Sequence, residues 1–137
     1  MTEGTDIVEF VRSIYEPWGR GDFSSPPDWA DPEIDFVVPD GPRAGAVSGP
    51  AALVEAWREL LSAYEDFRTP VEEYRLLDDE RVLVLLRNEG RGKASGIDVG
   101  ELARAANIVT VRGGKVVRLV AYWDRDLAFD ELGLEPE

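Results

Sequence analysis

The stretch Val82-Leu83-Val84-Leu85-Leu86 is the longest aliphatic run of the sequence, with an apolar residue at every position. A strand with one face in water alternates apolar and polar residues, so this run predicts a strand that is covered on both faces. One face is expected to meet helices. A second copy of the chain is the simplest cover for the other face, and a homodimer is therefore predicted. The residues expected on that outer face are Leu83, Leu85, Ile108, Val120 and Tyr122.

Further strands are expected on both sides of this run, with two tight turns between them. Apolar residues, often alternating with polar ones, predict these strands, whose ranges are 33–38, 70–77, 81–89, 97–112 and 115–123. Asp78-Asp79 predicts one turn, and Gly113-Gly114 predicts a two-residue hairpin. The stretch from Pro39 to Gly49 is expected to be a loop, because it is rich in Gly and Pro.

Helical spacing appears in three other segments. Thr5 and Asp6 are candidate caps of a first helix that ends at Gly19 or Gly21, and Gly49-Pro50 begins a second helix. Asp124 is expected to cap a short last helix that ends near Gly133. Early helices followed by successive strands predict an α+β domain spanning residues 1–137, with the helices on one face of a curved antiparallel sheet.

Composition excludes several kinds of chemistry. The 137 residues include no Cys and no His, which rules out thiolate nucleophiles, Ser-His-Asp catalysis and His-ligated zinc. With 15 Lys and Arg against 28 Asp and Glu, the net charge is −13, so neither nucleic acid nor a membrane surface is an expected partner. No metal-ligand cluster or cofactor motif is visible, so no cofactor is expected. The acidic, polar N-terminus is not typical of a signal peptide, and the expected location is cytoplasmic.

Five segments carry a resemblance to a known family: Ile14–Asp22, Gly49–Trp57, Gly90–Gly96, Thr110–Lys115 and Tyr122–Arg125. Together, and in this order, they resemble the SnoaL-like branch of the nuclear transport factor 2-like superfamily. The resemblance implies a cone-shaped α+β fold, in which a curved antiparallel sheet wraps around helices and leaves a pocket at its concave face. Members include ketosteroid isomerases, polyketide cyclases, epoxide hydrolases, dehydratases and non-catalytic binding or adaptor proteins, so the fold does not decide the function.

The resemblance to ketosteroid isomerases implies three catalytic candidates. Asn107 stands at the position of the oxyanion Asp, where an Asn amide can donate a hydrogen bond but cannot shuttle protons. Val38 stands at the position of the general base, which leaves Asp40 in the following loop as the candidate base. Tyr15 is next to Ile14, which matches the helix tyrosine of the isomerases, and is expected to assist as a donor.

The resemblance to epoxide hydrolases leaves the register of one strand open. Ala121 stands at the position of the activating Asp. Its partner Arg and Asp correspond to Leu86 and Asn88 or, shifted by one residue, to Arg87 and Glu89. A shift of one residue moves a side chain to the opposite face of the sheet. The register with Leu86 and Asn88 in the pocket is favoured, because it continues the apolar face of the same strand.

Aromatic and apolar side chains are expected to form the pocket wall, since such walls suit flat apolar ligands. The expected ligand-binding residues are Trp18, Trp29, Phe36, Val38, Trp57, Leu86, Asn88, Ala121 and Trp123. One predicted function is binding of a small apolar molecule, with isomerase- or cyclase-like proton transfer next to a carbonyl. The alternative is a non-catalytic dimeric binding or adaptor module.

Overall fold

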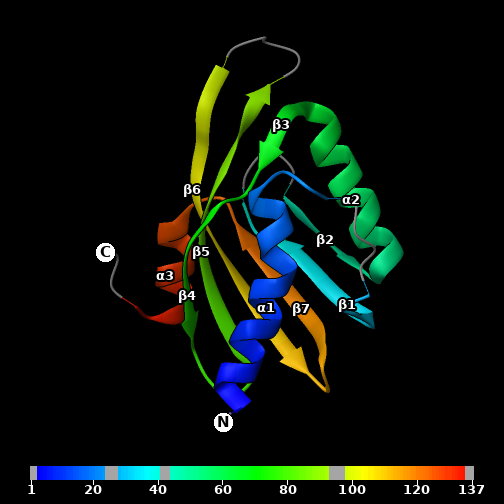
Figure 1. The fold of residues 1–137 in the computed structure, drawn as a ribbon, viewed down its shortest axis with the longest axis vertical. Coiled ribbons are helices and arrows are strands. Elements are labelled where there is room, and N and C mark those ends of the chain that lie inside the picture. Colours follow the sequence, from blue (N-terminus) through cyan, green and yellow to red (C-terminus); the bar gives the residue numbers. More distant parts are fainter. Residues whose placement is uncertain (1–2, 24–27, 41–43, 93–97, 135–137) are drawn as a thin grey trace.

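The computed structural model describes residues 3–23, 28–40, 44–92 and 98–134, in which a strongly curved sheet lies between helices (Figure 1). The helices of this part are α1 (Glu3–Gly19), α2 (Pro50–Ala63) and α3 (Arg125–Leu132). Its strands are β1 (Ala30–Val38), β2 (Gly45–Ser48), β3 (Tyr64–Arg68), β4 (Val71–Leu76), β5 (Arg81–Gly92), β6 (Asp98–Arg112) and β7 (Lys115–Tyr122). The predicted α+β class is confirmed.

The strand order in the sheet is β2-β1-β7-β6-β5-β3, and β4 also pairs with β5. The successive strands β5, β6 and β7 pair antiparallel, as the sequence predicts, and β6 turns into β7 at Gly113-Gly114. β1, however, pairs parallel with β7, so the sheet is mixed rather than wholly antiparallel. After β1 the chain passes through β2, α2 and the strands β3 to β6. It then returns as β7, which lies beside β1 and runs in the same direction.

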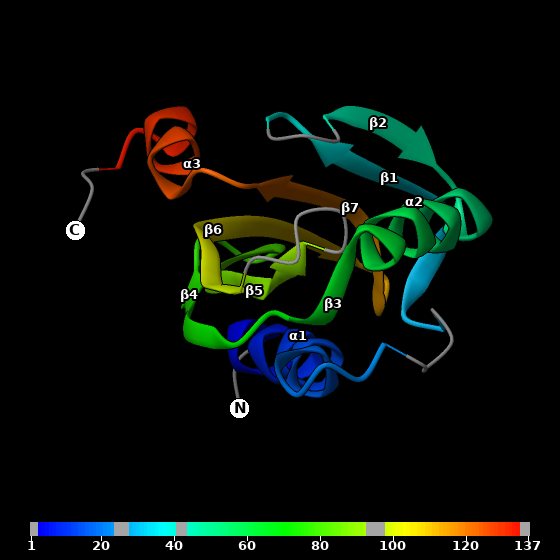
Figure 2. The ribbon, with the colours of Figure 1, turned by 90° about the horizontal axis from the view of Figure 1, so that it is seen from above.

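Both faces of β5 are covered within the chain. Val82, Val84 and Leu86 pack into the core on the concave side with α1, whereas Leu83 and Leu85 pack on the outer side with α3. Figure 2 shows α1 and α3 on opposite sides of the sheet. The prediction that the helices share one face is therefore wrong for α3.

The outer face obtains its cover from α3. Ala128 and Phe129 of this helix pack against the five residues that the sequence places on that face, and all five are no more than 9% exposed in the single chain. Covering these residues therefore does not require a second copy. The homodimer itself stays a prediction.

Two strands lie where the sequence predicts none. β2 occupies part of the stretch expected to be a loop, and β3 follows α2 directly. β3 bulges at Asp66, whose φ of 54° is left-handed, and it approaches β5 closely at Gly90. A Cβ atom on Gly90 would lie 3.3 Å from the carbonyl oxygen of Glu65 and 3.3 Å from the Cα of Phe67, so a side chain there would push β3 away.

The helix boundaries agree with most of the predicted signals. α2 begins at Pro50, and the Asp124 side chain caps α3 by accepting a hydrogen bond from the Asp126 amide. Gly133, with a φ of 70°, ends α3. α1 begins at Glu3, before the expected caps Thr5 and Asp6. In the described residues, no helix has both the length and the apolar character needed to cross a membrane.

Candidate functional site

A cavity of about 90 Å³ lies between α1, α2 and the concave face of the sheet. One water needs about 10–15 Å³ of such space, so the cavity can hold a group larger than a water. Its lining includes all the predicted site residues except Trp29 and Asp40. These are Tyr15, Trp18, Phe36, Val38, Trp57, Leu86, Asn88, Asn107, Ala121 and Trp123.

Sequence reasoning missed the other lining residues, which are Phe23, Leu60, Leu61, Phe67, Thr69, Leu119 and Tyr122. Leu60 and Leu61 belong to the apolar stripe of α2, so the helical period already indicated that they face inward. Phe67 and Thr69 come from β3 and the residue after it, which no sequence signal identified. Tyr122 was expected on the outer face and also reaches the cavity from the end of β7.

Tyr15 and Asn107 form a buried hydrogen-bonded pair in the cavity wall. The Asn107 Nδ2 donates to the Tyr15 Oη across 2.6 Å, and thereby joins α1 to β6. The phenol oxygen accepts this bond, so the phenol proton remains able to bond to another acceptor. Tyr15 is 1% exposed and Asn107 is 8% exposed. Burial raises the pKa of Tyr15 above its ordinary value, so the phenol is a neutral donor at physiological pH.

Trp18 holds the aromatic wall of the cavity together. Its ring packs edge-on against Tyr15, with 4.7 Å between centroids, and against Trp57, with 4.5 Å. Such edge-to-face geometry is favourable for aromatic pairs. Trp29 contacts the rings of both Trp18 and Trp57 but does not line the cavity. It therefore packs behind these two rings, on the side away from the cavity.

Asp40 lies outside the cavity lining. One of its carboxylate oxygens accepts a hydrogen bond from the Trp123 amide and the other from the Asp124 amide, each across 2.9 Å. Both oxygens are therefore engaged with the backbone at the end of β7. In this arrangement Asp40 holds the chain at Trp123, which itself lines the cavity, and its role as a base stays a prediction.

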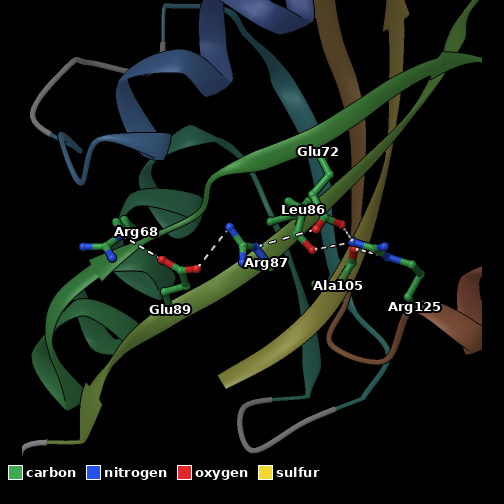
Figure 3. Close-up of polar contacts among 7 residues, drawn as sticks. All are labelled: Arg68, Glu72, Leu86, Arg87, Glu89, Ala105 and Arg125. Atoms are coloured by element: carbon green, nitrogen blue, oxygen red, sulfur yellow. Dashed lines mark hydrogen bonds and ion pairs between the residues drawn. The ribbon is translucent and has the colours of Figure 1, made fainter. Parts of the chain in front are cut away.

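Leu86 and Asn88 both line the cavity, which is the register favoured from the sequence. The alternating residues Arg87 and Glu89 belong instead to a row of charges (Figure 3). Glu89 pairs with Arg68 across 2.8 Å and with Arg87 across 3.4 Å. The one-residue alternation of the strand thus keeps these charges away from the cavity.

The row of charges continues to α3. Glu72 pairs with Arg87 across 3.7 Å and with Arg125 across 2.7 Å. Arg125 is 8% exposed, and it also donates to the carbonyl oxygens of Leu86 and Ala105 across 2.9 Å and 3.2 Å. One arginine at the start of α3 therefore ties this helix to β5 and β6 (Figure 3).

The cavity wall carries no ionised side chain among the residues that the structure describes. Besides the indole N–H groups of its three tryptophans, its polar groups are those of Tyr15, Tyr122, Asn88, Asn107 and Thr69, and burial raises the pKa of both tyrosines. In the same part of the chain, no group of three or more Asp or Glu side chains could hold a metal ion. The arrangement suits a neutral ligand with hydrogen-bonding oxygens.

A second cavity, of about 250 Å³, adjoins the first. It lies between α2 and β2 and shares part of its wall with the first cavity. The shared residues are Phe36, Val38, Trp57, Leu60 and Trp123. A rotation of Trp57 or Leu60 would therefore change the space available on both sides.

Comparisons with known proteins identify the kind of domain. The sequence model described as SnoaL-like domain matches residues 11–119. No protein of curated function matches the sequence significantly.

Solved structures share the fold at low sequence identity. An NTF2-like protein from Burkholderia thailandensis E264 has a TM-score of 0.75 at 19% identity, covering 99% of each chain. TerC, co-crystallised with polyporic acid, has a TM-score of 0.71 at 21% identity, covering 96% of this chain and 98% of its own. A protein assigned as a polyketide cyclase from Sinorhizobium meliloti has a TM-score of 0.64 at 17% identity, covering 86% and 97%.

Proposed function

The chain belongs to the SnoaL-like domain family, and we propose that its cavity binds a small neutral molecule through a carbonyl oxygen. The Tyr15–Asn107 pair carries the proposal. Because the amide donates to the phenol oxygen, the phenol proton can be donated to a ligand. A donor fixed in a largely apolar wall is well placed to polarise a carbonyl.

The aromatic wall supports a ligand that contains a ring. Trp18, Trp57 and Phe36 offer flat apolar surfaces, and apolar walls with few polar groups are typical of small-molecule sites. One protein of the same fold was crystallised with polyporic acid, and another is assigned as a polyketide cyclase. We propose carbonyl-bearing ring compounds as the ligand class of this chain as well.

Binding and carbonyl polarisation are favoured over proton transfer by a carboxylate. A general base must come within hydrogen-bond reach of the proton that it removes. Asp40 is engaged with two backbone amides, and the described lining offers only phenols as titratable groups. These phenols have raised pKa values, so they remain donors rather than bases.

The charge preference of the cavity tests this proposal. We expect 4-ethylacetophenone to bind and 4-acetylbenzoate to bind at least about tenfold more weakly, because an unpaired carboxylate is costly to bury. The dissociation constant of the ketone should stay constant between about pH 6 and about pH 9, since the pKa values of Tyr15 and Tyr122 lie above 10.0.

Isothermal titration calorimetry at several pH values measures both quantities. The ethyl compound and the carboxylate share the same acetophenone core, so their difference isolates the charge. Equal or tighter binding of 4-acetylbenzoate would contradict a neutral site. Loss of ketone binding within that pH range would show that a group other than these phenols controls the site.

A further inference from the structure

Thr69 is a buried polar residue of the cavity wall whose hydroxyl has no evident structural task. It is 8% exposed and lies directly after β3. Its Oγ1 has no hydrogen-bond partner among the residues that the structure describes. Buried hydroxyls are usually paired, because an unpaired one loses its bonds to water without replacement. An exception in a cavity wall points to a ligand.

Asn88 lies across from Thr69 on the neighbouring strand. Arg68 pairs with Glu89, and the Arg87 amide donates to the Pro70 carbonyl, so the antiparallel register sets Thr69 opposite Asn88. Both residues line the cavity. Residues directly opposite in an antiparallel pair have their Cβ atoms about 4.5–5.5 Å apart, so one ligand group can meet both side chains.

This second polar position is separate from the Tyr15–Asn107 pair. Asn88 pairs with Ala103 on β6, whereas Asn107 lies four residues further along β6. Four residues of strand correspond to about 13 Å between the Cα atoms. The long side chains shorten this gap within the cavity, yet the two polar positions remain at different places along the sheet.

We propose that Thr69, together with Asn88, binds a second oxygen of the ligand, at the end away from the carbonyl held by Tyr15. The inference rests on the proposed function and narrows its ligand class to neutral ring compounds with an oxygen at each end. Rotation about χ1 moves the Thr69 hydroxyl among three staggered positions, so the hydroxyl can turn to the ligand. Thr and Asn both donate and accept, which suits a hydroxyl or a second carbonyl.

The test compares two probes that differ only at the far end, 4-ethylacetophenone and 4-(hydroxymethyl)acetophenone. Their dissociation constants are measured by calorimetry for the parent chain and for Thr69→Val, and each chain is described by the ratio of the two constants. We expect Thr69→Val to shift this ratio against the hydroxymethyl compound by about three- to tenfold, as for one neutral hydrogen bond. Thr69→Ser, which keeps the hydroxyl, should retain the parent ratio.

A matched control and a stability measurement separate ligand binding from a structural role. Thr110→Val makes the same change on β6 outside the cavity lining and should leave the ratio unchanged. Because Thr69 Oγ1 has no partner, Thr69→Val should keep or raise the melting temperature of the free protein. A lower melting temperature together with an unchanged ratio would overturn the inference.

The outcomes also distinguish this inference from the proposed function. Binding of both probes with the same ratio in the parent chain and in Thr69→Val overturns the second polar position and leaves carbonyl binding intact. Binding of neither probe to the parent chain overturns the proposed function and this inference together.

Discussion

Replacing Phe129 by alanine is expected to lower the free energy of unfolding by about 3–5 kcal/mol, the cost of deleting a buried phenyl ring. Phe129 is 1% exposed and packs with Ala128 on the outer face of the sheet. Its loss would open a cavity above β5 and β6 and weaken the attachment of α3. Urea unfolding followed by tryptophan fluorescence measures the effect.

Leu127 provides the matched control on the same helix. Its side chain is 42% exposed, so Leu127→Ala should change the free energy of unfolding by no more than about 0.5 kcal/mol. Equal effects of the two substitutions would contradict the conclusion that α3 covers the outer face. Light scattering of the parent chain at micromolar concentration tests the predicted homodimer separately, and a monomer would exclude it.

Replacing Arg125 by methionine is expected to cost about 2–4 kcal/mol of unfolding free energy, because two buried carbonyl groups lose their donor. These are the carbonyls of Leu86 and Ala105, on adjacent strands of the sheet. Methionine keeps much of the apolar stem of arginine, so the change removes mainly the hydrogen bonds. Chemical denaturation measures the loss.

Arg58→Met is the control for a salt bridge in water. The Arg58 and Glu55 side chains are 69% and 58% exposed, so breaking their pair should cost no more than about 0.5 kcal/mol. A comparable loss at both positions would contradict a special role of Arg125.

At acidic pH, the parent chain and Arg125→Met should differ less in their free energy of unfolding than at neutral pH. The hydrogen bond from Arg125 lowers the pKa of Glu72 below its ordinary value of 4.5. A carboxyl with a lowered pKa stabilises the fold above its unfolded pKa, and this contribution is lost as the pH falls through the folded pKa. The two carbonyl bonds of Arg125 do not titrate, so part of the difference should persist in acid.

The sequence predicts the fold best where local pattern and packing agree. The apolar run of β5 indicates two covered faces, and both are covered. The pattern does not say what covers them, because a short helix with Ala128 and Phe129 and a second chain satisfy the same apolar surface. That ambiguity led to the wrong placement of α3.

β3 was not predicted because its sequence has neither the pattern of a strand nor that of a buried segment. Tyr64 continues the apolar stripe of α2, and three of the next four residues are charged. Pairing with β5 overrides this local pattern and depends on the close approach at Gly90. Thr69 follows β3, so its place in the cavity could not be predicted either.

The alternation of side chains along a strand made part of the candidate site predictable. The alternation that places Leu86 on the concave side also places Asn88 there. The hydrogen bond between Tyr15 and Asn107 was not predictable, because it joins residues 92 positions apart and depends on how α1 crosses the sheet. The position of Asp40 outside the cavity lining was not predictable either, because it depends on hydrogen bonds to the backbone after β7.

The affinity of 4-ethylacetophenone for Tyr15→Phe shows whether the phenol binds a ligand carbonyl. Tyr74→Phe is the matched control, because Tyr74 lies on β4 outside the cavity lining. Tyr15→Phe should weaken binding by about tenfold, as expected for one well-placed hydrogen bond in an apolar wall, while Tyr74→Phe should change it by less than about twofold. Equal affinities of the parent chain and both variants would contradict carbonyl binding by the Tyr15 phenol.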